Sequence, residues 1–75
     1  MEPRPLAIQG DVILLQALLK ITGTIGNGGE VKSFLAENPV RVNGQPEQRR
    51  GRQLRDGDLI ELPDGETVRI VAEVR

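Results

Sequence analysis

The densest group of chemically active side chains lies between Gln48 and Arg55, where arginine occupies four of eight positions. These arginines are Arg49, Arg50, Arg52 and Arg55. A guanidinium group carries a permanent positive charge and a planar set of N–H donors, which suits the oxygens of a phosphate group. Gly51 has no side chain and lets a ligand approach the backbone closely. Taken alone, the segment fits either phosphate binding or a solvated loop whose arginines pair with acidic residues elsewhere.

A second candidate site is the sequence Asn27-Gly28-Gly29, which we predict to open a helix. Backbone amides at the positive end of a helix dipole can hold a phosphate group. The lysine and hydroxyl residue of a nucleotide-binding P-loop do not follow, so capping of the helix by Asn27, with Glu30 three positions later, is the simpler interpretation. Lys32 adds a basic group one turn into the same helix.

The residue types that are absent argue against catalysis. The chain has no histidine and no cysteine, so the usual near-neutral general base, the thiolate nucleophile and the soft metal ligands are missing. Ser33 is the only serine, and a catalytic triad cannot be assembled without histidine. The carboxylates are scattered and form no evident acid/base pair. We therefore expect a protein that is not an enzyme and has no cofactor or metal.

Cysteine usage and hydropathy also indicate where the chain acts. Without cysteine there is no disulfide framework, which fits a reducing, cytoplasmic location. No apolar run approaches the roughly 20 residues that span a bilayer, and the amino terminus lacks the pattern of a signal peptide. We expect a single small domain with no membrane partner.

Charge is segregated along the chain, although the formal net charge is only -1. From Val31 to Arg55 the balance is +4, with six basic residues (Lys32, Arg41, Arg49, Arg50, Arg52, Arg55) against two acidic ones (Glu37, Glu47). From Asp56 to Arg75 the balance is -4, with Arg69 and Arg75 against Asp56, Asp58, Glu61, Asp64, Glu66 and Glu73. Polyanions respond to the local field, so the segregation predicts a basic surface for an acidic polymer.

Two helices should position the first basic residues. Asp11 is a good N-cap, and helical spacing predicts a first helix from there to about Thr22. Its predicted buried face consists of Val12, Leu15, Leu18, Leu19 and Thr22. Gln16 and Lys20, four residues apart, then form an exposed polar stripe, so Lys20 should point to solvent.

The second helix is predicted to follow a connection from Gly23 to Gly29 that contains four glycines. Its inward face is Val31, Phe34 and Leu35, which leaves Lys32 outside. Asn38 is expected to end this helix in the left-handed conformation, and Pro39 prevents its continuation.

The rest of the chain has the alternating pattern of strands. Leu6–Ile8 predicts an edge strand before the first helix; Val40–Val42, Leu59–Leu62 and residues 67–74 predict three more. Val68, Ile70, Ala72 and Val74 form the predicted inner face of the last strand. Asn43-Gly44 is a strong hairpin signal, and Gln45–Asp58 should be a polar loop with few paired residues. The predicted fold is α+β, with two short N-terminal helices packed on a small antiparallel sheet.

The order of these motifs resembles a known family. Two short helices are followed by V-x-V-N-G (Val40 to Gly44), a basic loop, and G-D-x-I (Gly57 to Ile60). This order resembles the RNA-binding domain named after the fourth small-subunit ribosomal protein, or alpha-L motif. Small stand-alone bacterial members also have L-x-x-L-L-K, G-G-x-x-K and R-R-G-R-x-L. These motifs correspond here to residues 15–20, 28–32 and 49–54.

The resemblance covers residues 11–62, with a C-terminal strand at 67–74, and implies one RNA-binding domain over residues 1–75. The chain departs from the family where Asn38-Pro39 replaces the usual glycine before V-x-V-N-G, and where Val31 replaces a small alanine. By position, the RNA-binding residues would be Lys20, Gly28, Gly29, Lys32, Arg41, Arg49, Arg50, Arg52 and Arg55. The implied partner is structured ribosomal or transfer RNA, with the ribosome or an RNA-modifying enzyme as further partners and no small-molecule substrate.

Two interpretations of other classes were compared with RNA binding. Ubiquitin-like sulfur carriers also display V-N-G and G-D-x-I, but they need a C-terminal Gly-Gly, whereas the given sequence ends Ala72-Glu73-Val74-Arg75. A protein-interaction module whose arginines dock an acidic partner stays open from sequence alone.

Overall fold

The computed structural model describes residues 3–26 and 28–73 of the 75-residue chain. In chain order its elements are β1 (Arg4–Gln9), β2 (Ile13–Leu14), α1 (Leu15–Ile21), the short 3-10 helix η1 (Gly28–Glu30), α2 (Val31–Glu37), β3 (Val40–Val42), β4 (Gln45–Glu47), β5 (Gln53–Leu54), β6 (Leu59–Glu61) and β7 (Thr67–Glu73). The fold is therefore α+β, as the sequence predicts.

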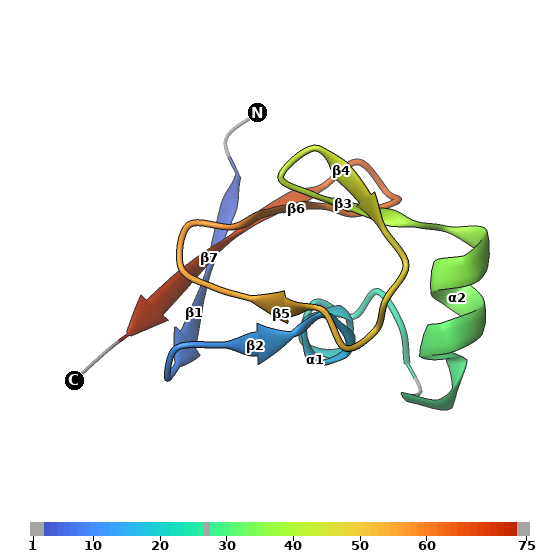
Figure 1. Cartoon of the computed structure of the whole chain (residues 1–75), viewed down its shortest axis with the longest axis horizontal. Helices are drawn as coiled ribbons and strands as arrows, with labels where there is room; N and C mark the ends of the chain where they lie inside the picture. Colours follow the sequence, from blue (N-terminus) through green and yellow to red (C-terminus); the bar gives the residue numbers. More distant parts are fainter. Residues whose placement is uncertain (1–2, 27, 74–75) are drawn as a thin grey trace.

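The main sheet has five strands in the order β1-β7-β6-β3-β4. The predicted strand at Leu6–Ile8 is confirmed as part of β1, which lies at one edge of this sheet. It runs parallel to β7, whereas the other pairs are antiparallel, so the prediction of an antiparallel sheet is wrong for this one pair. A separate ribbon of β2 and β5 lies below β3, β4 and β6 in the view of Figure 1, with α1 following β2 directly.

A single hydrophobic core joins the sheet, the ribbon and both helices. Its buried members are Ile8, Leu15, Leu18, Leu19, Ile25, Val31, Leu35, Val40, Val42, Leu54, Ile60, Leu62, Val68 and Ile70. The predicted stripes are confirmed for the buried leucines of α1 and for Val31 and Leu35 of α2, with Phe34 partly buried beside them. Val12 and Thr22, also predicted on the buried face of the first helix, lie outside α1 and are only partly buried. The core also contains Leu54, from a region predicted to be loop. Val74, predicted to face inward, lies outside the described residues.

The first helix begins later than predicted. Asp11 is not its N-cap: Ile13 and Leu14 are extended and pair with β5, and α1 starts at Leu15 without a side-chain cap. The free amides at the start of a helix need acceptors, and here the acceptors are backbone carbonyl oxygens from a distant segment. The predicted end is correct, since Thr22 is the C-cap.

The ends of the second helix also differ from the prediction. A 3-10 turn precedes α2, whose N-cap is Glu30 without a side-chain hydrogen bond. The proposed cap Asn27 lies outside the described residues. Asn38 does not adopt the left-handed conformation, because its φ is -133°. Its backbone N–H and side-chain Nδ2 both donate to the Phe34 carbonyl oxygen, at 2.7 and 3.3 Å, and so complete the last turn of the helix.

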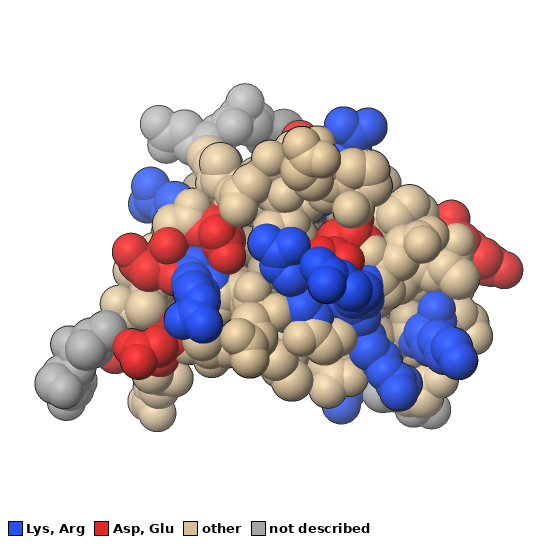
Figure 2. All heavy atoms as spheres, in the orientation of Figure 1, with Lys and Arg blue, Asp and Glu red and all other residues tan. Residues whose placement is uncertain are grey.

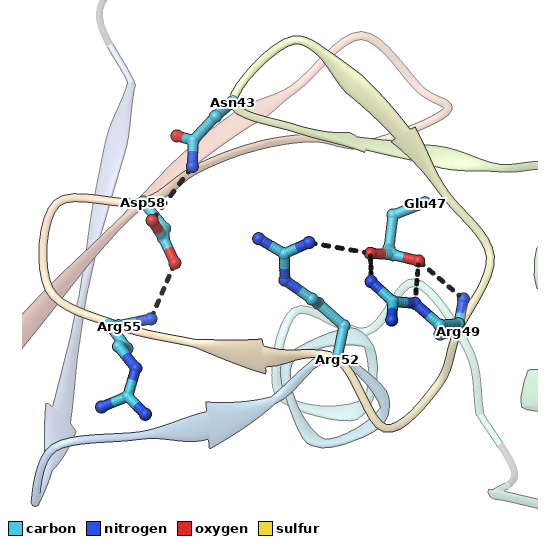
Figure 3. Close-up of polar contacts among 6 residues, drawn as sticks. All are labelled: Asn43, Glu47, Arg49, Arg52, Arg55 and Asp58. Carbon is cyan, nitrogen blue, oxygen red and sulfur yellow. Dashed lines mark hydrogen bonds and ion pairs between the residues drawn. The ribbon is translucent and has the colours of Figure 1, made fainter.

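The two turn motifs of the sequence are bonded to one another. Asn43 and Gly44 have φ angles of 53° and 84°, as a tight hairpin between β3 and β4 requires. Asn43 Nδ2 donates to Asp58 Oδ1 at 3.0 Å, and its Oδ1 accepts from the Leu59 backbone N–H at 3.0 Å. Asp58 Oδ2 accepts from the Arg55 backbone N–H at 2.8 Å (Figure 3). These bonds fix the end of the arginine-rich segment against the β3–β4 hairpin.

Candidate nucleic-acid interface

The arginine segment, defined here as Gln48–Arg55, is attached to both helices. The backbone N–H groups of Leu15 and Gln16, at the start of α1, donate to the carbonyl oxygens of Arg52 and Arg50 at 2.9 and 3.0 Å. Gln48 Nε2 donates to the Ala36 carbonyl oxygen of α2 at 3.5 Å. A segment predicted as a polar loop is thereby a bridge between helices that are separate in sequence.

Glu47, the last residue of β4, holds two of the arginines. It pairs with Val40 in the β3–β4 register, so its side chain lies on the same inner side of the sheet as that buried valine. Glu47 Oε2 accepts from Arg49 Nε at 3.0 Å and from the Arg49 backbone N–H at 3.1 Å. Its Oε1 accepts from Arg49 Nη2 at 3.1 Å and from Arg52 Nη1 at 3.0 Å (Figure 3). Both carboxylate oxygens are thus used.

Burial makes this carboxylate unusual. Only 7% of Glu47 is exposed, and it is the one buried polar or charged residue among the described positions. A buried charge is costly unless it is paired and hydrogen-bonded, and the four N–H donors meet that requirement. Hydrogen bonds from Arg49 chiefly, and also from Arg52, lower the pKa of the Glu47 carboxyl from 4.5 to about 2, although burial acts in the opposite direction. The same bonds raise the pKa of Arg49.

The stability of the domain should depend on this carboxylate in acid. Because folding lowers the pKa of Glu47, its contribution is complete above the unfolded pKa near 4.5 and is lost as the pH falls toward 2. After allowance for screening around the exposed Arg49, we expect a loss of about 2 kcal/mol. Urea unfolding of the wild type and Glu47→Gln at pH 7, 4 and 3 measures this loss: the difference in free energy of unfolding between the two proteins should shrink as the pH falls. Glu37→Gln, an exposed control, should track the wild type; a constant difference between the wild type and Glu47→Gln would contradict the prediction.

A surface pocket of about 520 Å³ lies along the arginine segment. Its lining consists of Arg49, Gly51, Arg52, Gln53 and Arg55. Three arginines and a glycine therefore line one open space. Such a lining offers charge-assisted N–H donors to an anion with several oxygens, for which a phosphate group is the natural match.

Other predicted residues extend the basic surface beyond the pocket. Lys20 on α1, Lys32 on α2 and Arg50 are exposed, and the described part of the chain offers their side chains no hydrogen bond or ion pair. Gly28 and Gly29 form the 3-10 turn immediately before α2. Figure 2 shows Lys and Arg gathered over the β4–β5 connection, with further basic atoms over α2. In the same view, acidic atoms lie toward the β7 end and beside α2, with a few more next to the basic atoms at the centre.

The structure separates Arg41 from this group. Val40 and Val42 are buried while Arg41 between them is exposed, so the alternation of β3 turns Arg41 to the opposite side of the sheet from Glu47. Arg41 pairs in register with Glu61 of β6 and lines a different pocket with it. The basic surface therefore comprises two helices and the arginine segment, without β3.

Glu47 belongs to the site, although by sequence it counts only as a negative charge in a basic segment. Glu47 follows a hairpin signal, and a two-residue turn at Asn43-Gly44 brings it opposite Val40. An inward-facing glutamate two and five residues before arginines is a signal for a buried ion-pair cluster. Treating the whole of Gln45–Asp58 as loop concealed this pattern.

The described residues contain neither a metal-binding cluster nor a helix suited to crossing a membrane. No group of three or more acidic, histidine or cysteine side chains in residues 3–26 and 28–73 is arranged to hold a metal ion. Within the same ranges, no helix has the length and apolar character needed to cross a bilayer.

The fold and the basic surface define a small α+β module of the type that the sequence motifs indicated. The family model for the S4 domain matches residues 6–71, and the chain belongs to this S4 domain family. The resemblance to the alpha-L RNA-binding motif is thereby confirmed. The chain is also similar to the probable ribosome maturation protein RlbA of Bacillus subtilis (strain 168), with 43% identity over 58 residues, which cover 77% of this chain and 82% of that protein.

Proposed function

We propose that this protein binds structured ribosomal RNA during ribosome maturation and catalyses no reaction itself. The observation that carries the proposal is the arginine segment, which lies across both helices of an S4 domain and leaves its charged groups at the surface. The similarity to a protein named for ribosome maturation supports ribosomal over transfer RNA as the target. Its physical partner would be a folded RNA element, free or within a ribosomal particle.

The proposed contact residues follow from the basic surface. They are Lys20, Gly28, Gly29, Lys32, Arg49, Arg50, Arg52 and Arg55. Arg41 is left out because it lies on the other side of the sheet. Lysine and arginine at these positions would contact phosphates, whose charge dominates affinity for nucleic acids.

The composition supports recognition of RNA by its shape and backbone. Phe34 is the only aromatic residue, and it is packed against the core. Recognition of unpaired bases usually relies on stacking against aromatic side chains, which this surface does not offer. We therefore propose a helical or otherwise folded RNA element as the ligand.

A fluorescence-anisotropy titration tests the proposal directly. A labelled ribosomal RNA hairpin library, a transfer RNA and polyglutamate are titrated with the protein at several salt concentrations. We expect micromolar or tighter binding to at least one ribosomal hairpin at low salt, weakening steeply as salt rises. An absence of salt-sensitive RNA affinity would refute the proposal, and tighter binding to polyglutamate would favour docking of an acidic protein instead.

A further inference from the structure

Glu47 is a negative charge at the centre of a surface that we propose to bind a polyanion. By Coulomb's law alone, a carboxylate in this position should weaken the attraction to phosphate. Its surroundings suggest a different effect. It contacts two of the three arginines that line the pocket, and it does so from the buried side of the cluster, with 8% of its side chain exposed against 74% for Arg49 and 36% for Arg52.

The hydrogen bonds of Glu47 leave particular donors unused. Arg49 donates to the carboxylate through Nε and Nη2, and Arg52 through Nη1. Arg49 Nη1 and Arg52 Nε and Nη2 have no hydrogen bond among the described residues. Figure 3 shows Arg52 beside the carboxylate and Arg49 below it; Arg49 is bonded along the Nε and Nη2 edge of its guanidinium group and Arg52 through Nη1 alone. The two guanidinium groups are thus held in place by Glu47 while some of their N–H donors stay available to a ligand.

From this geometry we infer that Glu47 is a positioning residue for RNA binding. Its carboxylate holds Arg49 and Arg52 so that their unused N–H donors are presented to one phosphate group in the pocket that both arginines line. The inference rests on the proposed function, since the phosphate is that of the bound RNA. The cluster of one carboxylate and two guanidinium groups keeps a net charge of +1, and Arg55 adds a further positive charge at the rim.

The physical advantage is preorganisation. An arginine on a surface samples many rotamers, and that freedom is lost when it binds a ligand. Arg49 and Arg52 lose much of it on folding, because Glu47 already orders them. Arg50 has no such partner among the described residues and keeps its freedom until RNA binds. Rigid support of contact residues by neighbours behind them is how binding sites in general hold their geometry.

The inference is tested by whether neutralising the charge of Glu47 raises or lowers the affinity for RNA. Glu47→Gln and the control Glu37→Gln each remove one negative charge, and Glu37 is exposed on α2, next to the Ala36 carbonyl that Gln48 contacts. In anisotropy titrations with the ribosomal hairpin, we expect Glu37→Gln to bind as well as the wild type or slightly more tightly. Glu47→Gln should bind about tenfold more weakly, because both arginine side chains would then lose their rotamer freedom on binding RNA instead of on folding.

The dependence on salt separates positioning from simple electrostatics. Both arginines stay charged in Glu47→Gln, so the slope of log affinity against log salt should match the wild type while affinity falls at every salt concentration. Equal or tighter binding by Glu47→Gln would overturn the inference. That result differs from failure of the proposed function itself, in which the wild type shows no salt-sensitive RNA binding.

A measurement on the unaltered protein covers the case in which Glu47→Gln does not fold. Nitrogen relaxation of the arginine Nε–H groups reports how ordered each side chain is before RNA is added. Arg49 and Arg52 should be nearly as rigid as the backbone, whereas Arg50 should be mobile. If Arg49 and Arg52 are as mobile as Arg50 in the free protein, Glu47 does not position them and the inference fails.

Discussion

Reversing the charge of Lys32 and Arg50 together should lower affinity for a ribosomal RNA hairpin by about a hundredfold at low salt. Each substitution to glutamate removes a cation and adds a repulsive charge. The two residues come from different elements of the basic surface, α2 and the arginine segment, so together they test whether that surface acts as one site. Anisotropy titrations should also show that the slope of log affinity against log salt falls by about two.

These two residues are chosen because their loss should leave the fold intact. Both side chains are exposed and make no hydrogen bond or ion pair within the described residues. Arg49 would be a poor choice, because a glutamate there would face the buried carboxylate of Glu47. A circular-dichroism spectrum and a melting curve like those of the wild type would show that the variant is folded, so that its lower affinity comes from lost RNA contacts and not from unfolding.

The matched control reverses Arg41 and Arg69 instead. It changes the net charge by the same amount, but both residues are exposed on strands of the main sheet, and Arg41 faces away from the core side on which Glu47 lies. Uniform attraction of RNA to the whole molecule would weaken both double variants equally. We expect the affinity of the control for RNA to fall by less than about tenfold, against about a hundredfold for the Lys32 and Arg50 variant. Equal losses would mean that RNA is attracted to the molecule as a whole, and would contradict binding by the basic surface as one site.

Local patterns predicted the parts of the fold that depend on neighbours in sequence. The stripe of buried leucines in α1 and the Val31 and Leu35 pair in α2 follow from helical spacing, since each helix buries the side that carries them. The hairpin at Asn43-Gly44 follows from turn chemistry. These features need no knowledge of the rest of the chain, and all of them are confirmed.

The parts that sequence did not predict depend on contacts between distant segments. Ile13 and Leu14 are extended because they pair with Leu54 and Gln53, about forty positions later, and this pairing overrides the N-cap signal of Asp11. The parallel partnership of β1 with β7 joins the two ends of the described chain. Neither pairing leaves a mark within a short window of sequence.

The candidate site divides in the same way. Exposed positions for Lys20 and Lys32 could be predicted because they follow from helix periodicity. The exclusion of Arg41 and the inward direction of Glu47 required the register of the β3–β4 pair. The alternation along β3 already indicated that Arg41 points away from its buried neighbours. The family resemblance assigned Arg41 to the RNA-binding surface by its position in the motif, without regard to the side of the sheet on which it lies.

Replacing Leu54 by alanine should lower the free energy of unfolding by about 3 kcal/mol, the typical cost of a leucine cavity in a core. Leu54 is fully buried, although it lies in the most polar segment of the chain, between exposed Gln53 and Arg55. It pairs with Ile13 and so ties the arginine segment to the core beneath it. A domain of this size has a total stability of about 4 to 11 kcal/mol, so the loss is a large fraction of the whole.

Chemical denaturation measures this loss, with Leu59→Ala as the control. Leu59 is 37% exposed on β6, so its truncation leaves little cavity and should cost less than about 1 kcal/mol. Because Leu54 is the buried anchor between the exposed arginines, Leu54→Ala should also weaken RNA binding at temperatures where the protein is still folded, whereas Leu59→Ala should not. Equal destabilisation by the two substitutions would mean that β5 is not anchored in the core. The arginine segment would then be a loose loop, and the fixed guanidinium groups beside Glu47 would lose their support.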